Sequence, residues 1–274
     1  MSCLKLIVLN MCLWPVGLRQ CWSDTNKDNR LKSLLSLLLD ENSQLGTADV
    51  VCLQEFFDSV YSYKFTQQLK KALMGSVWHI ATGPDPSWKT LCTRGCLINS
   101  GLIILSKHEF LTVRFESFEH NPGLMGWMNA GFLHVQLKLA SSIDIINCHL
   151  YPDEGRSDAK SIREKQLNEL HEYTQQLHNK VAIAGDFNIH QSSDEYKYMT
   201  KLLETEEEAI IPSNEVTMHN CQNWADHKQC ITSDYVLGKN GVYFGQTKIL
   251  YDAVYIKLSD HYPILTHLLS KEKA

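Results

Sequence analysis

The sequence has no apolar run long enough to cross a membrane. Its leucine-rich stretch from Leu34 to Leu39 is far shorter than the ~20 residues that a transmembrane helix requires. The apolar run from Leu4 to Leu9 is too short for the core of a signal peptide, and no small-residue cleavage site follows it. We therefore expect a soluble, cytoplasmic protein. Such a protein can still work at a membrane surface without spanning the membrane.

The cysteine pattern lacks the pair separated by two residues that redox and zinc motifs share. The nine cysteines are an odd number, and several of them, such as Cys52 and Cys148, lie within apolar runs. In such a setting a free cysteine acts as a small hydrophobic residue. Reduced thiols in an intracellular protein are the expectation.

No internal repeat, low-complexity tract or linker rich in Gly, Ser or Pro divides the 274 residues. We therefore expect a single catalytic domain over residues 1–274.

The sequence has no excess of basic residues. Its 26 Lys and Arg are outnumbered by 31 Asp and Glu, which gives a net charge of −5. This balance weighs against nucleic acid as the partner, because phosphate contacts need clustered Lys and Arg, but it leaves room for a nuclease with a local basic groove.

The chain contains short apolar runs typical of buried strands, including Leu4–Leu9 and Val254–Ile256. Between the runs, other segments place apolar residues three and four positions apart, which predicts helices packed on a sheet. These segments are residues 29–40, 63–74, 161–177 and 193–203. Because strands without polar alternation are buried on both faces, the sequence predicts an α/β fold with helices outside.

Polar side chains gather next to the ends of the predicted strands. They are Asn10, Glu55, His149, Asp186, Asn188, Asp234, Asp260 and His261. Carboxylate and amide oxygens are hard ligands, which favour Mg²⁺, Mn²⁺ or Ca²⁺ over zinc. Two histidines beside carboxylates supply acid–base capacity near neutral pH. The set as a whole predicts metal-assisted hydrolysis of a phosphate ester.

Seven segments carry these residues in a fixed order. They are Leu9-Asn10, Gln54-Glu55, Ser100-Gly101, Asn147-Cys148-His149-Leu150, Gly185-Asp186-Phe187-Asn188, Ser233-Asp234-Tyr235-Val236-Leu237 and Ser259-Asp260-His261-Tyr262-Pro263-Ile264. The order resembles that of the endonuclease/exonuclease/phosphatase superfamily, which has the fold of pancreatic deoxyribonuclease. The resemblance extends from Leu4 to Leu268 and implies a four-layer α/β sandwich, with two packed mixed β-sheets flanked by helices.

The resemblance also implies a role for each matching residue. Asn10 and Glu55 match the metal-binding pair of the superfamily, and Asp260 matches a further acidic residue beside that metal. The expected cofactor is Mg²⁺, with Mn²⁺ as the alternative. His261 matches the general base, and Asp234 matches the carboxylate that fixes its tautomer.

The remaining matches concern the phosphate. Asp186 and Asn188 match residues that position the attacking water and bind the phosphate. His149 matches the second histidine, which binds the phosphate, stabilises charge in the transition state and assists the leaving group. No covalent intermediate is expected.

Three segments are similar to the neutral sphingomyelinase branch. They are residues 99–107, Asp186-Phe187-Asn188-Ile189-His190 and Ser233-Asp234-Tyr235-Val236-Leu237. Ala184 stands before Gly185 where inositol 5-phosphatases usually carry Trp, and Ala130 stands where the sphingomyelinase branch often carries Lys. The resemblance implies hydrolysis of sphingomyelin, or of a related phospholipid, to ceramide and phosphocholine at a membrane surface.

Two tryptophans, Trp14 and Trp127, lie in segments that suit contact with a lipid substrate. Exposed indole rings enter the interface of a bilayer readily, so we expect both to bind the substrate and the membrane surface. The alternative is that both are packed under loops, since tryptophan is highly buried on average.

Two other functions remain open from the sequence. A Mg²⁺-dependent endonuclease or exonuclease acting on DNA or RNA would use the same site with a track of Lys and Arg along it. A catalytically inactive binding module would keep the fold and lose the reaction.

Overall fold

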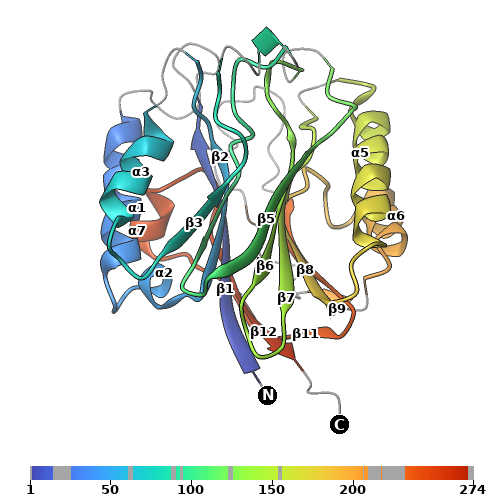
Figure 1. Ribbon diagram of the computed structural model, residues 1–274. Helices are drawn as coiled ribbons and strands as arrows, with labels where there is room; N and C mark the ends of the chain where they lie inside the picture. Colours follow the sequence, from blue (N-terminus) through green and yellow to red (C-terminus); the bar gives the residue numbers. More distant parts are fainter. Residues whose placement is uncertain are drawn as a thin grey trace.

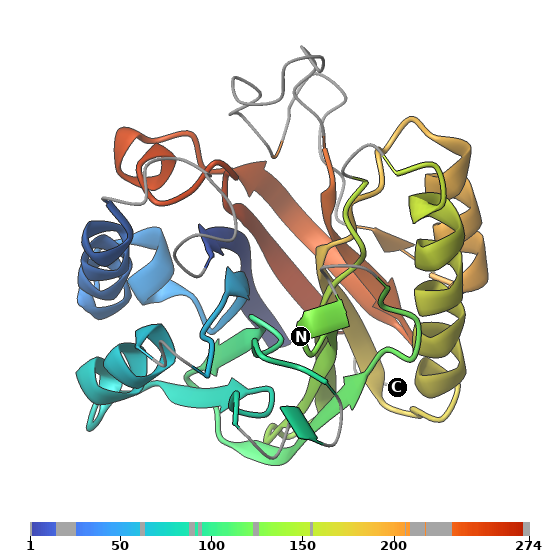
Figure 2. The same cartoon turned by 90° about the horizontal axis from the view of Figure 1, so that it is seen from above.

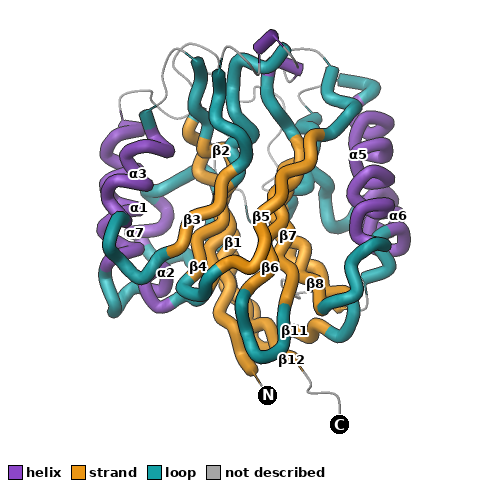
Figure 3. Tube along the Cα trace, in the orientation of Figure 1, coloured by secondary structure: helices purple, strands orange, loops and turns teal. Residues whose placement is uncertain are grey.

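The computed structural model places two β-sheets face to face, with helices on both outer sides (Figure 1). It describes residues 2–14, 26–60, 64–87, 91–92, 95–122, 126–153, 156–205, 207–208, 217 and 232–270. Figure 3 shows the resulting order of layers, helix, sheet, sheet and helix. The four-layer α/β sandwich expected from the resemblance is confirmed.

The first sheet has six strands in the order β11-β12-β1-β2-β4-β3 within the described residues. The strands are β1 (Ser2–Leu13), β2 (Val50–Phe56), β3 (His79–Thr82), β4 (Ile103–Ser106), β11 (Val242–Ile249) and β12 (Ile264–Ser270). β1 runs parallel to β2 and antiparallel to β12. The sheet is therefore mixed.

The second sheet has the order β5-β6-β7-β8-β10-β9 in the described part of the chain. Its strands are β5 (Phe110–Ser117), β6 (Gly131–Leu137), β7 (Ile143–His149), β8 (Lys180–Asp186), β9 (Glu207–Glu208) and β10 (Asp234–Lys239). β7 runs parallel to β8, and β10 runs antiparallel to β8. This sheet is mixed as well.

Helices cover the outer face of each sheet, as the view from above shows (Figure 2). The helices beside the first sheet are α1 (Lys27–Leu39), α2 (Gln44–Thr47), α3 (Phe65–Leu73) and α7 (Ala253–Ile256). Those beside the second sheet are α5 (Ala159–Thr174) and α6 (Asp194–Leu202). The four helices predicted from apolar spacing are therefore confirmed, with bounds that differ by a few residues. In the described residues no helix combines the length and the apolar character needed to cross a membrane.

The alternation of side chains along β1 explains why its sequence is apolar throughout. Leu6 and Val8 point into the cluster between the two sheets, whereas Ile7 and Leu9 point into the cluster under α1 and α3. Successive residues of a strand face opposite sides of the sheet, so a sheet covered on both faces needs apolar residues at every position.

The prediction of a strand at residues 254–256 is wrong. These residues form the short helix α7, in which Tyr255 is buried under the first sheet. The hydroxyl of Tyr255 accepts a hydrogen bond from the backbone N–H of Gln44 at 3.1 Å. A three-residue apolar run is too short for its period to separate a strand from a single helical turn.

The strand register brings the predicted site residues to one end of the sandwich. In the first sheet Asn10 pairs with Gln54 across the parallel strands β1 and β2. In the second sheet Asp186 pairs with both His149 and Asp234. This end lies opposite the chain termini (Figure 1). Both sheets therefore contribute polar residues to the same end of the fold.

Candidate functional site

Asp186 lies at the centre of the polar cluster at this end of the sandwich. Its Oδ2 accepts a hydrogen bond from Nδ2 of Asn10 at 3.0 Å. The same oxygen lies 3.8 Å from Nε2 of His149 and 3.9 Å from Nε2 of His261. One carboxylate from the second sheet therefore faces two imidazoles and a side chain from the first sheet.

His261 and Asp234 form a buried hydrogen-bonded pair. Nδ1 of His261 lies 2.9 Å from Oδ2 of Asp234, and the two side chains are 3% and 2% exposed. An ionised carboxylate only accepts hydrogen bonds, so Nδ1 is the donor and Nε2 is left to face Asp186. This is the arrangement expected of a general base and the group that orients it.

The charges around His261 determine its pKa. Burial by itself would lower the pKa of this imidazole, because it disfavours the charged form. The negative charges of Asp234, Asp186 and Asp260 outweigh burial and hold the pKa of His261 well above its ordinary value. These carboxylates therefore favour the protonated form of the ring.

Glu55 adopts an unusual backbone conformation near the end of β2. Its φ of 51° is in the left-handed region, which a side chain other than glycine enters only when its surroundings compensate. Oε2 of Glu55 accepts a hydrogen bond from the indole nitrogen of Trp14. Oε1 lies 3.7 Å from Nε2 of His149. The indole therefore leaves one carboxylate oxygen facing the cluster.

Asn188 and Gly185 shape the turn that follows β8. The backbone N–H of Asn188 donates to Oδ1 of Asp186 at 2.9 Å, and the Asn188 amide donates to the Leu150 carbonyl at 2.9 Å. A side chain at Gly185 would bring its Cβ to 1.9 Å from the Cys148 carbonyl oxygen. Glycine is therefore required there for β7 and β8 to approach and for Asp186 to reach the cluster.

In the described part of the chain, two groups of buried side chains have the spacing of metal ligands. One joins Glu55, His149 and Asp186, and the other joins Asp186, Asp234 and His261, with ligand atoms within 4.8 Å of one another in each. Asn10 is tied to both groups by its hydrogen bond to Asp186. The two groups share Asp186, and their five carboxylate and imidazole side chains fit a hard divalent cation.

Asp260 is the expected metal residue that belongs to neither group. It is half-buried, and its Oδ1 accepts a hydrogen bond from the Ser259 hydroxyl at 3.2 Å. The structure thus brings Glu55 and Asn10 to the cluster and places Asp260 next to His261 in the chain, at the margin of the same cluster.

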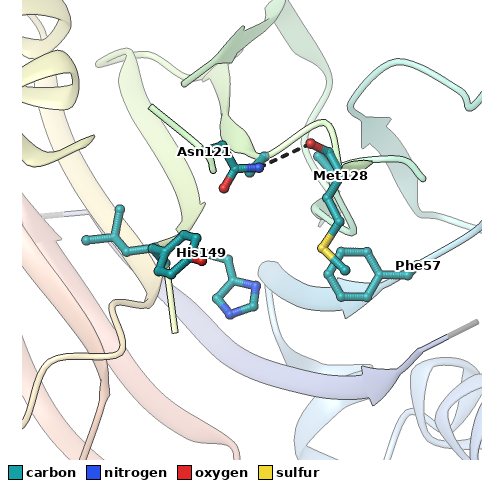
Figure 4. Close-up of a pocket in the computed structure, with 8 residues that line it drawn as sticks. Phe57, Asn121, Met128 and His149 are labelled. Atoms are coloured by element: carbon teal, nitrogen blue, oxygen red, sulfur yellow. Dashed lines mark hydrogen bonds between the residues drawn. The ribbon is translucent and has the colours of Figure 1, made fainter. Parts of the chain in front are cut away.

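A small pocket opens beside His149. Its lining residues are Phe57, Ser100, Asn121, Met128, Ala130, His149, Leu150 and Tyr151. Figure 4 shows His149, Met128 and Phe57 around the same space, with the Asn121 amide donating to the Met128 carbonyl at 3.3 Å. Within the described part of the chain, this lining contains aromatic and aliphatic surface and no carboxylate or ammonium group.

The two tryptophans expected at the membrane have different environments. Trp127 is 50% exposed, and its carbonyl accepts hydrogen bonds from the backbone N–H groups of Leu97 and Ile98 at 2.8 and 3.1 Å. Trp14 is only 4% exposed, because its ring packs on Phe57 and its indole donates to Glu55. The expectation of an exposed Trp14 is therefore wrong, and the prediction of a membrane contact now concerns Trp127.

Two buried amides below the cluster were not singled out from the sequence. Gln54 donates to Oδ1 of Asn147 at 2.6 Å, and the Asn147 amide donates to the carbonyls of Leu53 and Ile103 at 2.8 and 3.0 Å. These bonds join the two sheets directly under the site. Gln54 directly precedes Glu55, and Asn147 lies two residues before His149, and this closeness to strand-end residues is the signal that could have identified them.

Comparisons with known proteins agree with this geometry. Residues 21–261 match the sequence profile of the Endonuclease/Exonuclease/phosphatase family. The chain is 24% identical over 302 residues to a "Phospholipase C" of Staphylococcus aureus, covering 95% of this chain and 86% of that protein. It is 29% identical over 186 residues to "Sphingomyelin phosphodiesterase 5" of Danio rerio, covering 58% of this chain and 33% of that protein.

A solved structure has the same fold. The β toxin of Staphylococcus aureus, crystallised as an F277A, P278A mutant with bound magnesium ions, superposes with a TM-score of 0.73 at 20% identity, over 98% of this chain and all of that one. A similarity of this extent at low identity establishes a shared fold.

Proposed function

Because the chain belongs to the endonuclease/exonuclease/phosphatase family, we propose that it is a Mg²⁺-dependent phosphodiesterase of the sphingomyelinase type. The proposed reaction is hydrolysis of sphingomyelin, or of a related phospholipid, to ceramide and phosphocholine, carried out by residues 1–274 as one catalytic domain. The observation that supports it most is the His261–Asp234 pair, which faces Asp186 at 3.9 Å within a cluster that both sheets supply.

The metal would be held by Glu55 and Asn10, with Asp260 beside them and Asp186 in contact with Asn10. When bound, Mg²⁺ supplies positive charge that stabilises the phosphate oxygens and offsets the carboxylates that raise the pKa of His261. Mn²⁺ has the same preference for oxygen ligands and would serve in its place.

In the proposed reaction His261 acts as the general base. Its Nε2 accepts a proton from a water molecule, whose oxygen attacks phosphorus in line with the leaving oxygen. Asp234 holds Nδ1 at 2.9 Å, which keeps the ring in the tautomer that accepts at Nε2 and stabilises the imidazolium that forms. Asp186 and Asn188 position the water and bind the phosphate.

His149 would act on the other side of the phosphate. Its Nε2 lies 3.7 Å from Oε1 of Glu55 and 3.8 Å from Oδ2 of Asp186. In this role His149 stabilises charge on the phosphate, and the departing ceramide oxygen takes a proton from its ring as the P–O bond breaks. The products are phosphocholine and neutral ceramide, with no covalent intermediate.

The surroundings of His149 support a lipid rather than a nucleic acid as the substrate. Among the residues that the structure describes, the adjoining pocket is lined by Phe57, Met128 and Tyr151 and lacks the Lys and Arg that phosphodiester chains require. Next to Met128, the exposed ring of Trp127 is suited to enter the interface of a bilayer. The substrate therefore approaches from a membrane surface at this end of the sandwich.

The choice between lipid and nucleic acid is tested by presenting both to the same preparation. Sphingomyelin vesicles and a supercoiled plasmid are incubated with the protein and Mg²⁺, and the release of phosphocholine and the nicking of DNA are measured. We expect phosphocholine release and an intact plasmid. Plasmid cleavage without phosphocholine release would assign the site to the nuclease branch, and inactivity on both would favour a binding module.

A further inference from the structure

Arg30 is a buried cation whose hydrogen bonds all go to backbone carbonyls. Its side chain in α1 is 3% exposed. Nη1 donates to the carbonyls of Met11 and Leu258 at 2.8 and 3.2 Å, and Nη2 donates to the carbonyl of Cys12 at 2.9 Å. The remaining donor, Nε, is buried and has no partner among the described atoms. A charged group in such a position needs a reason beyond packing.

The three carbonyls belong to two segments of the candidate site. Met11 and Cys12 follow Asn10 directly, in a bulge of β1 where Cys12 has a φ of 48°. Leu258 precedes the Ser259-Asp260-His261 turn, and the backbone N–H of His261 is held by the Ser259 hydroxyl at 3.2 Å. Arg30 thus joins the segment of the expected metal ligand to the segment of the expected general base.

A second buried cation of α1, Lys27, binds the backbone of the same segment a few residues further along. Lys27, one helical turn before Arg30, is 4% exposed and donates from Nζ to the Trp14 carbonyl at 2.5 Å. The indole of Trp14 in turn donates to Glu55. The first turn of α1 therefore supports the segment from Met11 to Trp14 through its backbone carbonyls.

Elementary energetics explain why a guanidinium is needed at this place. A bulge removes carbonyls from the ladder of the sheet, and a buried carbonyl without a donor costs about 1–3 kcal/mol. The planar fork of Arg reaches carbonyls on two different segments, whereas the ammonium of Lys is a single point of contact. An apolar side chain of the same size would fill the space and leave the carbonyls unsatisfied.

We propose that Arg30 is a positioning residue of the hydrolase, fixing the Asn10 segment relative to the His261 turn. The assignment of a catalytic consequence rests on the proposed function, whereas the tie between the two segments is a property of the fold. Loss of the tie lets the metal-binding amide and the general base move apart, and misplacement by about 1 Å costs on the order of 100-fold in rate.

The tie itself is tested without any reference to activity. Hydrogen–deuterium exchange is measured on the metal-free protein for peptides covering residues 9–14 and 257–262, in the wild type, Arg30→Lys and Leu34→Ala. Leu34 lies on the same helix and is fully buried in the apolar cluster that also contains Met11 and Leu258, so its truncation loosens the packing of α1 and leaves the carbonyl contacts of Arg30 in place. We expect Arg30→Lys to speed exchange in both peptides by about tenfold, equivalent to ~1.4 kcal/mol of local opening, and Leu34→Ala to speed it by less than Arg30→Lys in both. Equal exchange in Arg30→Lys and wild type would overturn the proposal.

The catalytic consequence is tested by steady-state kinetics with Mg²⁺. We expect Arg30→Ala to lower kcat on the order of 100-fold with little change in KM, because the substrate pocket is untouched. Millimolar guanidinium chloride should restore turnover to Arg30→Ala and leave the wild-type rate unchanged, whereas methylammonium should not. A kcat within twofold of wild type, or a decrease of the same size in Leu34→Ala, would overturn the positioning role.

Failure of the two proposals can be told apart. If the wild type hydrolyses no phosphodiester, the proposed function fails, and the exchange of the two peptides still decides whether Arg30 ties the segments. If the wild type is active and Arg30→Ala matches it, the proposed function stands and the positioning role fails.

Discussion

The hydrogen bond between Nδ1 of His261 and Oδ2 of Asp234 is the contact on which proposed catalysis depends most. Asp234→Asn keeps the size of the side chain and removes its charge, so the imidazole loses the partner that fixes its tautomer. We expect kcat to fall by about 10²–10⁴ with a small change in KM. Initial rates on a soluble phosphodiester check this, and a decrease of less than about threefold would contradict the assigned role.

The same variant changes the titration of His261 in the metal-free protein. The carboxylate of Asp234 is the largest of the influences that raise the pKa of this ring, so its removal leaves burial, which lowers the pKa, less opposed. The midpoint observed by NMR for His261 should therefore move to lower pH in Asp234→Asn. A midpoint that stays or rises would show that the two side chains are not paired in solution.

A second residue-scale prediction concerns the exposed ring of Trp127. Trp127→Ala should lower turnover on sphingomyelin vesicles by about tenfold, since loss of ~1.4 kcal/mol of interfacial binding changes membrane occupancy by that factor. Hydrolysis of a soluble phosphodiester should not change. Tyr198→Ala, which removes another exposed aromatic ring from α6, is the matched control and should leave both rates unchanged. Equal losses on the two substrates would contradict a role at the membrane.

The sequence was informative about individual residues where a motif stands at a strand end and much less so elsewhere. The closeness of Asn10 to Glu55, and of His149 to Asp186, follows from the register of the parallel strands in each sheet, which apolar runs reveal. The burial of Trp14 depends on a hydrogen bond across two strands that no spacing encodes. Arg30 was missed because a cation in a helical pattern is ordinarily solvated.

At the scale of the elements, a buried ion pair joins α5 and α6, the two helices beside the second sheet. Arg163 of α5 donates from Nε and Nη2 to the carboxylate of Glu195 at the start of α6, at 2.6 and 2.8 Å. Nη1 donates to the Tyr151 carbonyl at 3.1 Å. Both helices therefore depend on this pair for their placement against the pocket that contains Tyr151.

Arg163→Met should lower the free energy of unfolding by about 3–5 kcal/mol, because Glu195 is left as a buried and unpaired charge. The double variant Arg163→Met with Glu195→Leu should recover most of the loss, since the uncompensated charge is removed as well. Urea unfolding followed by circular dichroism measures both. A double variant no more stable than the single one would show that the helices depend on something other than the ion pair.

Helices were the elements that the sequence predicted best, because apolar spacing of three and four over more than two turns excludes a strand. α1, α3, α5 and α6 are the cases in point. α7 is the counter-example, since a run of three apolar residues carries no period. The bulge after Asn10 was also unpredictable, because Cys12 enters the left-handed region without a glycine to announce it.

At the scale of the whole molecule, burial between layers should decide which thiols react. Cys52 and Cys148 lie in β2 and β7 with no exposure, and burial raises the pKa of both thiols. Cys3 and Cys92 are exposed. A thiol reagent at neutral pH should modify Cys3 and Cys92 in the native protein and reach Cys52 and Cys148 only after unfolding. Mass spectrometry of the labelled peptides checks this, and early labelling of Cys148 would contradict the packing of the second sheet.

The packing of the sheets could be anticipated only in outline. Apolar strands such as Leu4–Leu9 indicate burial on both faces, which gives the order of layers. The contact between Gln54 of one sheet and Asn147 of the other fixes how the two halves meet under the site, and it depends on side-chain geometry that no pattern in the sequence describes.

The central claim is that this site hydrolyses a phospholipid with His261 as the base. Release of phosphocholine from sphingomyelin vesicles is measured with Mg²⁺ and with EDTA, for the wild type, His261→Ala and His178→Ala, the last being an exposed histidine outside the site. The prediction is Mg²⁺-dependent release by the wild type and His178→Ala, and none by His261→Ala. Release that persists in EDTA, or that survives His261→Ala, would contradict it.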